Sequence, residues 1–255
     1  MPTPFILKLE HGADLSDDDR QVLEQAAREV RHFSPRHDLI REGDRPDYVH
    51  VIREGIACRY KVVRDGGRQI MAYLLPGDFC DLHVSLLGEM DHNIGTLTAC
   101  MVALLPRTAV EDLTTKRAAI TRALWWATLV DEGILREWLV NMGRRPADQR
   151  LAHLLCELLL RLRCVGLASD TSFELPLTQG QLADTLGMTE VHLNRMVHQL
   201  RKAGLITLRD HLVYVGDVER LMAFADFNPN YLHLNKRPGT EPQREAATKV
   251  PRQPD

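Results

Sequence analysis

The segment from Met188 to Gly204, MTEVHLNRMVHQLRKAG, combines apolar residues at regular spacing with charged and hydrogen-bonding side chains. Its apolar residues stand at i, i+3, i+4 and i+7, which predicts a helix whose buried face is made of Leu193, Met196, Val197 and Leu200. At about 3.6 residues per turn, the opposite side carries a row made of Val191, Arg195, His198 and Lys202. Arginine pairs with guanine through two hydrogen bonds, and valine can meet a thymine methyl group. We therefore expect this face to lie in the major groove of DNA.

The outward residues divide according to the part of DNA that each would contact. The residues expected to read base edges, which carry the sequence information, are Glu190, Val191, Asn194 and Arg195. Phosphate contacts supply affinity rather than sequence information, and the residues expected to make them are Thr178, Thr189, His198, Arg201, Lys202 and Arg209. The alternative interpretation is a module of the same fold that contacts only other proteins.

Two short helices joined by a tight turn must position this face. Thr178, with Gln181 three residues later, forms a capping box that starts the first helix, and Gly187 ends it. One residue separates that glycine from Thr189, a good cap for the second helix, so the pair predicts a helix-turn-helix. The segment GLITLRDHLVYVGD that follows predicts two strands around a turn at 209–211, which together form a wing.

The N-terminal part of the chain shows a different pattern. Residues 14–30 predict a helix with one apolar side. From Phe33 to Pro106, short apolar runs alternate with glycines that recur at intervals of roughly 7 to 12 residues. The clearest piece is YKVVRDGGRQIMAYL, two strands joined by a hairpin turn at 65–67. This region therefore predicts an all-β sandwich or barrel.

A long helix is predicted between these two regions. Residues 115–142 contain no proline and predict one helix of about 42 Å, which Gly143 ends. A seam of coiled-coil type, expected to form a dimer interface, is made of Leu124, Ala127, Asp131, Ile134 and Trp138. A single wide core face in a monomer is the alternative. The tail from Asn228 is rich in proline and charge, which predicts disorder.

Composition argues against several classes of protein. No run of about 18 apolar residues and no signal peptide is present, so we expect a cytoplasmic protein without membrane contact. The five cysteines are scattered and are expected to be free thiols. The net charge is −3, but Lys and Arg gather between residues 144 and 209, as expected if one domain faces DNA. No phosphate loop, nucleophile elbow or HExxH motif occurs, so no enzyme activity is expected.

The chain resembles the Crp/Fnr family of bacterial transcription regulators over nearly all of residues 30–225. The segment LIREGDRPDYVHVIREGIACRYKVVRDGGRQIMAYLLPGDFCDLH is similar to the family's cyclic-nucleotide-binding-type β-roll, and LTQGQLADTLGMTEVHLNRMVHQLRKAGLI is similar to its DNA-reading segment. The resemblance implies an α+β chain divided into a sensory β-roll with an N-terminal helix at 1–112, a dimerisation helix at 113–143, a winged helix-turn-helix domain at 144–227 and a disordered tail at 228–255. It implies double-stranded DNA, a second copy of the chain and RNA polymerase as partners.

Within this resemblance, the DNA-reading helix departs from the best-studied members at one position. Arg195 falls on the family's base-reading arginine. The residue four positions before it is usually glutamate, but here it is Val191, with Glu190 one place earlier. Because valine cannot accept a hydrogen bond from cytosine, we expect this chain to prefer a different DNA sequence.

The sensing half departs further from the family. The cAMP-binding members hold the phosphate with an arginine after the GDF step, but no arginine lies between Arg68 and Arg107 here, so cAMP sensing is not expected. The oxygen-sensing members need an N-terminal cysteine cluster for an iron–sulfur centre, and residues 1–57 contain no cysteine, so that cofactor is not expected either. The residues expected near an effector pocket are Asp81, His83, His92 and Asn93. A metal, haem or redox role for Cys80, Cys100, His83 or His92 is a weaker alternative, and no metal site is expected.

These features together predict a function. The chain is expected to be a homodimeric, sequence-specific transcription regulator that binds a near-palindromic DNA site and responds to a signal other than cAMP. The alternative is a small-molecule receptor whose winged helix docks on a protein partner.

Overall fold

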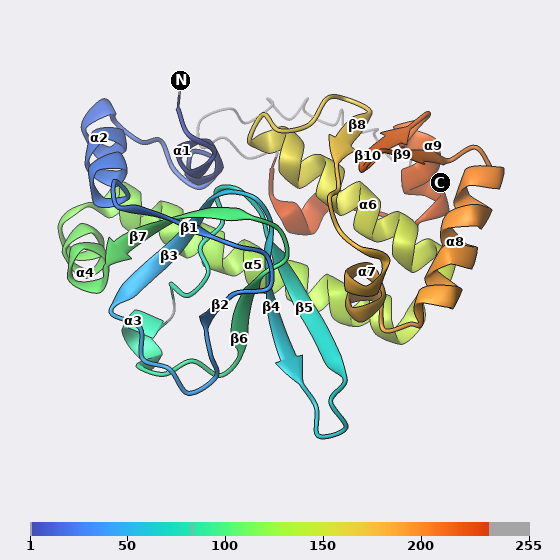
Figure 1. The fold of residues 1–255 in the computed structure, drawn as a ribbon. Coiled ribbons are helices and arrows are strands. Elements are labelled where there is room, and N and C mark those ends of the chain that lie inside the picture. The colour runs from blue at the N-terminus through green and yellow to red at the C-terminus, as the bar shows by residue number, and fades with distance from the viewer. Residues whose placement is uncertain (1, 83, 235–255) are drawn as a thin grey trace, which may run out of the picture.

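The structure is a computed structural model that describes residues 2–82 and 84–234. Its N-terminal half is a β-roll made of two antiparallel sheets (Figure 1). The strands of the first sheet, in spatial order, are β1 (Val30–Phe33), β7 (Cys100–Pro106) and β3 (Tyr48–Glu54); those of the second are β2 (Asp38–Ile40), β6 (Asn93–Thr96), β4 (Ala57–Val62) and β5 (Arg68–Leu74). Both sheets bury side chains in a shared core that includes Ile52, Leu74, Ile94 and Val102. The predicted all-β region is confirmed.

The hairpin between β4 and β5 forms where the turn sequence predicted it. Gly66 adopts a φ of 86°, a left-handed conformation that glycine takes without steric cost. The Gly67 N–H donates to Asp65 Oδ1 at 2.9 Å, and the Val63 N–H donates to the Gly67 carbonyl at 2.9 Å. A short helix, α3 (Val84–Leu87), lies between β5 and β6.

The helix predicted at 14–30 is wrong at both ends. It runs only from Asp17 to Ala26 (α2), behind a capping box made by Ser16 and Asp19. Val30 starts strand β1 instead and pairs with Ala103 of β7, because the sheet satisfies the backbone groups of 30–33 better than a frayed helix end would. A six-residue helix before it, α1 (Pro4–Leu9), is too short to show a periodic pattern and was not predicted.

The long helix also differs from its prediction. Residues 107–116 form a separate helix, α4 (Arg107–Lys116), and the long helix α5 runs from Ala118 to Arg144 with Gly143 inside it. The predicted helix is interrupted at Arg117, whose backbone is extended (φ −133°, ψ 97°). Its guanidinium pairs with Asp18 at 2.6 Å and with Asp19 at 3.0 Å. This ion pairing to α2 favours a break that the lack of proline could not reveal.

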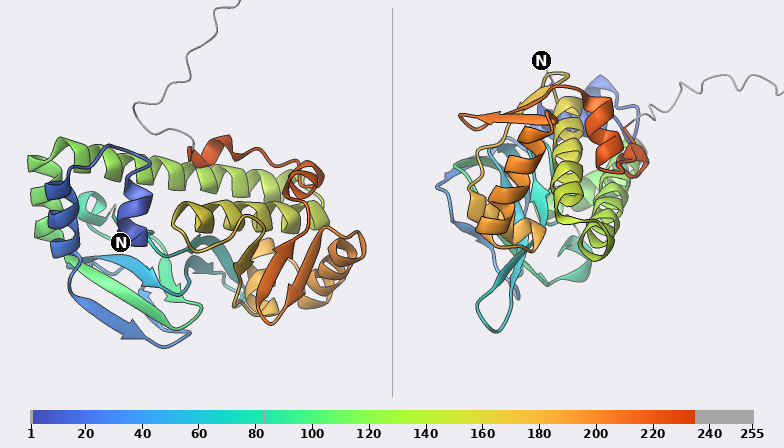
Figure 2. Two further views of the ribbon diagram at one scale, coloured as in Figure 1. Left: turned by 90° about the horizontal axis from the view of Figure 1, so that it is seen from above. Right: turned by 90° about the vertical axis from the view of Figure 1, so that its right-hand side faces the viewer.

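The C-terminal half is a winged helix-turn-helix domain packed beside α5. Helix α6 (Ala147–Cys164) runs alongside α5, as Figure 2 shows. The helix-turn-helix consists of α7 (Gln179–Leu186) and α8 (Glu190–Lys202); the wing sheet has the order β8 (Ser172–Glu174), β10 (Leu212–Val215), β9 (Ile206–Arg209), and α9 (Val218–Phe224) follows it. One apolar core runs through α5, α6, α7, α8, the wing and strand β5, so the two halves share it.

The segment from Asn228 is ordered where the structure describes it. Residues 229–232 form a 3₁₀ helix, η1 (Pro229–Leu232), that packs against α5. Leu232 is buried and the Tyr231 hydroxyl donates to Glu157 at 3.0 Å. The prediction of disorder is therefore wrong for 228–234, because two side chains in this short stretch find buried partners. The rest of the predicted tail lies outside the described residues.

His153 of α6 provides a test of the packing between α5 and α6. It is fully buried, and burial together with the charge of Arg145 lowers its pKa to about 3. The Glu137 carboxylate lies 3.3 Å from its Nε2 without forming a hydrogen bond, and it is held by Arg145 at 2.7 Å, so it does not offset the burial.

We expect the unfolding free energy to fall as the pH drops below about 6.5, because the unfolded chain takes up a proton at His153 that the folded chain excludes down to its lower pKa. The slope due to this group approaches about 1.4 kcal/mol per pH unit. Urea unfolding of the native protein and of His153→Gln between pH 5 and pH 7 measures it. Equal pH slopes for the two proteins would contradict the assignment.

Candidate nucleic-acid interface and sensor cavity

The helix-turn-helix is built by local contacts that the sequence encodes. Gln181 Oε1 accepts the Thr178 N–H at 2.8 Å, and Thr178 Oγ1 accepts the Gln181 N–H at 3.2 Å, which is the predicted capping box. Gly187 ends α7 in the left-handed region at φ 59°, and a Cβ there would lie 2.4 Å from Met142 Cε. Thr189 then caps α8 by accepting the His192 N–H at 3.2 Å. The turn is therefore tight because its glycine adopts a left-handed conformation, while Met142 Cε is the end of a flexible side chain and can move aside.

Helix α8 presents the two faces that its periodicity predicted. Leu193, Met196 and Leu200 are buried, and Val197 is half-buried. The outward residues are all exposed, and they are Val191, Asn194, Arg195, His198, Arg201 and Lys202. Val191 is 81% exposed, although its side chain is apolar. This exposed row lies on a helix at one end of the molecule (Figure 1), where it is open to solvent and to a partner.

The four other predicted DNA contacts lie outside this row. Glu190 leans over α7, with its Oε1 3.0 Å from where a Cβ on Gly180 would be. Thr178 and Thr189 are exposed and use their hydroxyl oxygens as helix caps. At the wing, Arg209 is exposed and lies 3.4 Å from Asp210. The structure therefore brings the α8 residues together and places Arg209 on a separate projection.

The β-roll holds the first helix of this module through polar contacts from β5. Arg68 Nη2 lies 2.7 Å from Asp184 Oδ2, and the Tyr73 hydroxyl lies 2.5 Å from Thr185 Oγ1. Gln181 Nε2 also donates to the Leu97 carbonyl at 3.1 Å. Helix α7 is thus docked on the β-roll, and α8 is positioned through it.

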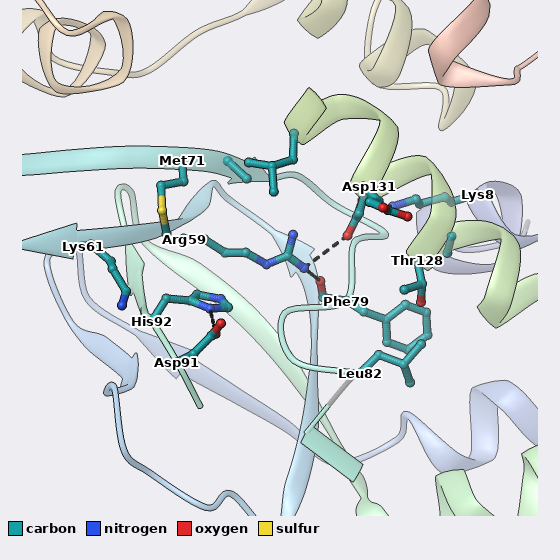
Figure 3. A pocket seen from close by; sticks show the side chains of 14 residues that line it. Lys8, Arg59, Lys61, Met71, Phe79, Leu82, Asp91, His92, Thr128 and Asp131 are labelled. Atoms are coloured by element: carbon teal, nitrogen blue, oxygen red, sulfur yellow. Dashed lines mark hydrogen bonds and ion pairs between the residues drawn. The ribbon is translucent and has the colours of Figure 1, made fainter. Parts of the chain in front are cut away.

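A cavity of about 400 Å³ lies between the β-roll and α5. Its apolar wall is formed by Met71, Ala72, Phe79, Leu82, Ala127 and Leu135, and its charged residues are Lys8, Arg59, Lys61, Asp91, Asp131 and Glu132. Figure 3 shows the guanidinium of Arg59 pointing toward Asp131, with the two atoms Nη2 and Oδ2 3.1 Å apart. The same guanidinium donates to the carbonyls of Phe79 (2.9 Å) and Cys80 (3.3 Å). The volume suits a small organic molecule.

The residues predicted near an effector pocket are only partly brought together. His92 lines the cavity, and burial lowers its pKa against the opposing effect of Asp91. Asp81 is fully buried elsewhere, where it accepts the His50 N–H and lies 2.8 Å from His50 Nδ1. Asn93 accepts the Glu42 N–H at 3.1 Å and does not line this cavity. His83 lies outside the described residues.

Sequence reasoning missed the two cations that β4 brings to the cavity. Arg59 and Lys61 stand two residues apart on one strand, so they face the same side of the sheet. This alternation is visible in the sequence, but the resemblance predicts a phosphate-binding cation only after the GDF step, a segment that does not include β4. Distance along the chain does not predict these cavity residues, because the β-roll brings the earlier strand β4 to the same cavity.

Burial bears on the reactivity of the cysteines and on metal binding. Burial raises the pKa of the Cys100 thiol and raises that of Cys80 well above its ordinary value, and a protonated thiol is a poor nucleophile and a poor ligand. Within the described part of the chain, no group of three or more His, Cys, Asp or Glu side chains is arranged to hold a metal ion.

The predicted dimer seam on α5 is wrong. Leu124, Ala127, Ile134 and Trp138 are buried inside the chain, and Asp131 forms the ion pair with Arg59. The face that α5 leaves uncovered carries a different apolar set, made of Trp125, Leu129, Leu139 and Val140. Both faces have helical spacing, and only the packed β-roll and α6 show which of them is covered.

The fold defines a class: a β-roll joined by a long helix to a winged helix-turn-helix, which is the architecture of a DNA-binding regulator. Two family models match the chain, a cyclic nucleotide-binding domain over residues 30–117 and a Crp-like helix-turn-helix domain over residues 149–224.

Relatives give the family. Over 199 residues the chain is 30% identical to the transcriptional activator protein FnrL of Cereibacter sphaeroides. This match covers 75% of the chain and 78% of the relative. It is also 30% identical over 195 residues to the nitrogen fixation regulation protein FixK of Bradyrhizobium diazoefficiens (76% and 81% covered). The structure of FixK2 from Bradyrhizobium japonicum has the same fold, with a TM-score of 0.69 at 24% identity over 77% of this chain and 96% of that one. The chain belongs to the Crp/Fnr family of transcription regulators. Among the described residues, no helix is both long and apolar enough to cross a bilayer.

Gly187 and Gly143 form a matched pair for testing the turn. Gly187→Ala should lower the unfolding free energy by about 1–2 kcal/mol, because a left-handed φ is costly for alanine. Gly143→Ala, in a helix with no atom within 4 Å of the new Cβ, should instead stabilise the protein by up to about 1 kcal/mol. Urea unfolding measures both. An unchanged unfolding free energy for Gly187→Ala would show that the turn does not require glycine at this position.

Proposed function

We propose that this protein is a homodimeric, sequence-specific transcription regulator that acts as an activator in the cytoplasm. The observation that carries the proposal is the exposed row on α8, in which Arg195 and Asn194 lie beside the apolar Val191. These side chain types match hydrogen-bonding and methyl-bearing base edges in the major groove. The relatives named as activators support activation, and contact with RNA polymerase is the route we propose for it.

The preferred DNA sequence follows from the composition of this row. Arg195 is proposed to pair with guanine, Asn194 to read a neighbouring base, and Val191 to contact a thymine methyl group. Glu190 leans over Gly180, and we propose that it reads a base at the edge of the site. His198, Arg201, Lys202 and Arg209, with Thr178 and Thr189, are proposed to contact phosphates, which fix the position of the module.

The dimer is proposed to form through the uncovered face of α5. Leu139 is 74% exposed, Trp125 is 68% exposed and Leu129 is 56% exposed, and all three lie on one side of a 27-residue helix. Large exposed apolar stripes of this kind mark interfaces, and a second copy of α5 offers a stripe of matching length. Pairing two chains would place two recognition helices one DNA turn apart, about 34 Å, on a near-palindromic site.

The β-roll is proposed to sense a small molecule other than cAMP in the cavity beside Arg59. The three cations that line the cavity are matched by three carboxylates, those of Asp91, Asp131 and Glu132. Arg59 is already engaged by Asp131 and by two carbonyls. A phosphate would bring a further negative charge beside these three carboxylates, which makes the site poorly suited to a cyclic nucleotide.

Selection of bound sites from random duplex DNA tests the proposed function, and two variants sharpen it. Arg195→Ala should remove discrimination at one base position per half-site, costing about 1–3 kcal/mol. Lys202→Ala should weaken binding to all sequences and flatten the dependence on salt. Affinities for the selected site and for random DNA at several salt concentrations measure both effects. Equal losses of Arg195→Ala on both DNAs would rule out base reading, and failure to select any sequence would favour a receptor that docks on a protein partner.

Leu139→Glu tests the dimer interface. A charge within the stripe should convert the protein to a monomer and abolish tight binding to the full palindrome, because burying an unpaired carboxylate is costly. Sedimentation velocity and DNA titration measure this. Val63→Glu, which adds the same charge at the exposed tip of the β4–β5 hairpin, is the matched control and should remain dimeric. A Leu139→Glu protein that stays dimeric would place the interface elsewhere.

A further inference from the structure

A chain of ionic contacts runs from the sensor cavity to the DNA-binding domain. Arg59 Nη2 of β4 lies 3.1 Å from Asp131 Oδ2 of α5, and Asp131 Oδ1 lies 3.7 Å from Lys8 Nζ of α1. Lys8 Nζ also donates to Asp78 Oδ1 at 2.6 Å. The other oxygen of Asp78 accepts from Arg161 Nη2 of α6 at 2.7 Å. These five residues, hereafter the ionic relay, come from five separate parts of the chain.

The relay is anchored at its far end within the DNA-binding half. Arg161 Nη1 lies 3.0 Å from Glu157 Oε1, one helical turn earlier on α6. Glu157 Oε2 accepts from Trp138 Nε1 of α5 and from the Tyr231 hydroxyl, each at 3.0 Å. Since α6 also packs against α8, the position of Arg161 is tied to the position of the recognition helix.

Burial makes these contacts strong and mutually dependent. Lys8, Asp78 and Arg161 are 8%, 3% and 9% exposed. Burial alone would lower the pKa of Lys8, but the carboxylates of Asp78 and Asp131 outweigh it and raise the pKa. Burial alone would raise the pKa of Asp78, and the charges of Lys8 and Arg161 outweigh that and lower it. Removing one member leaves its partner charged in a poorly solvated site, which is costly.

Lys8 is the branch point of the relay, because it is shared by two carboxylates. While Arg59 neutralises Asp131, Lys8 lies close to Asp78 and more distant from Asp131, at 2.6 Å and 3.7 Å. If Asp131 lost Arg59, its charge would draw Lys8 away from Asp78. Asp78 would then be held by Arg161 with less support, and the junction between the β-roll and α6 would loosen.

We propose that the ionic relay transmits occupancy of the sensor cavity to the DNA-binding domain, with the Arg59–Asp131 pair as its input. Arg59, Asp131 and Lys8 line the cavity, so a ligand oxygen that takes the guanidinium of Arg59 from Asp131 acts directly on the relay. The result is a looser α6 and a less preorganised recognition helix, which lowers DNA affinity. This inference rests on the proposed function of the cavity and of α8.

The chain offers matched controls for a test in the full-length protein. Arg59→Gln and Asp131→Asn each break the input pair. Lys61→Gln changes the other cation of the same strand, which pairs with Glu42, and Glu132→Gln changes the neighbouring acid of α5, which pairs with Arg136. All four positions line the cavity, but only the first two belong to the relay.

The first measurement is the Kd for the selected DNA site. Arg59→Gln and Asp131→Asn should each weaken binding about fivefold or more, the range of coupling between distinct sites, while both controls should change it less than about twofold. The increase in Kd of the double variant Arg59→Gln/Lys8→Met should be much smaller than the product of the increases of the two single variants, because both substitutions interrupt one relay. The proposal would be overturned if relay variants and controls changed the Kd equally. It would also be overturned if the double variant changed the Kd by the product of the two single changes.

A second measurement separates transmission from simple stabilisation. Nitroxide labels on Val63→Cys of the hairpin and Gln199→Cys of α8, both exposed, report the distance between the two halves. Selective labelling is practical because burial raises the pKa of all five native thiols. Relay variants should broaden the distance distribution, and the controls should not. A lower melting temperature with an unchanged distribution and Kd would leave Arg59 and Asp131 with a structural role only, which contradicts the relay. If the native protein selected no DNA sequence, the proposed function would fail. The distance measurement would still show whether the relay controls the arrangement of the two halves.

Discussion

The arrangement of the two halves depends on the buried carboxylate of Asp78. It lies in the turn after β5, where it accepts the Leu75 N–H at 2.8 Å, and it faces Lys8 of α1 and Arg161 of α6. Water does not solvate a charge in this buried position, so any movement of α6 away from the β-roll must separate oppositely charged groups in a medium of low polarity. Three segments that are far apart in the sequence are thereby fixed to one point.

The recognition helix inherits its orientation from this junction and from the contacts of α7. The apolar core joins α6, α7 and α8 into one unit, so the exposed row around Arg195 moves only when the unit moves. The Arg68–Asp184 pair and the Tyr73–Thr185 hydrogen bond hold the same unit on β5. Apolar packing alone tolerates small rotations, whereas hydrogen-bonded ion pairs have defined directions, and here they set the angle at which α8 is presented.

The cavity and the junction lie side by side because α5 passes both. Asp131 faces the cavity, and Trp138, two turns further on, donates to the Glu157 carboxylate that holds Arg161. The helix therefore covers the sensor with one face and leaves its other face, including Leu139, open to solvent. A single helix thus takes part in the proposed sensing, in the proposed coupling and in the proposed dimer, so all three depend on its position.

The sequence by itself determined the elements that depend on local order. The capping box at Thr178, the left-handed Gly187, the 65–67 hairpin and the buried face of α8 all follow from spacing within one or two turns, because hydrogen bonds and side chain periodicity act over that range. Tertiary structure decided which of two apolar faces of α5 is covered, why the chain breaks at Arg117, and that Arg59 reaches the cavity. Those outcomes depend on contacts between residues far apart in the chain, such as Arg117 with Asp18 and Arg59 with Asp131. Periodicity shows that a face is apolar, but only packing shows what lies against it.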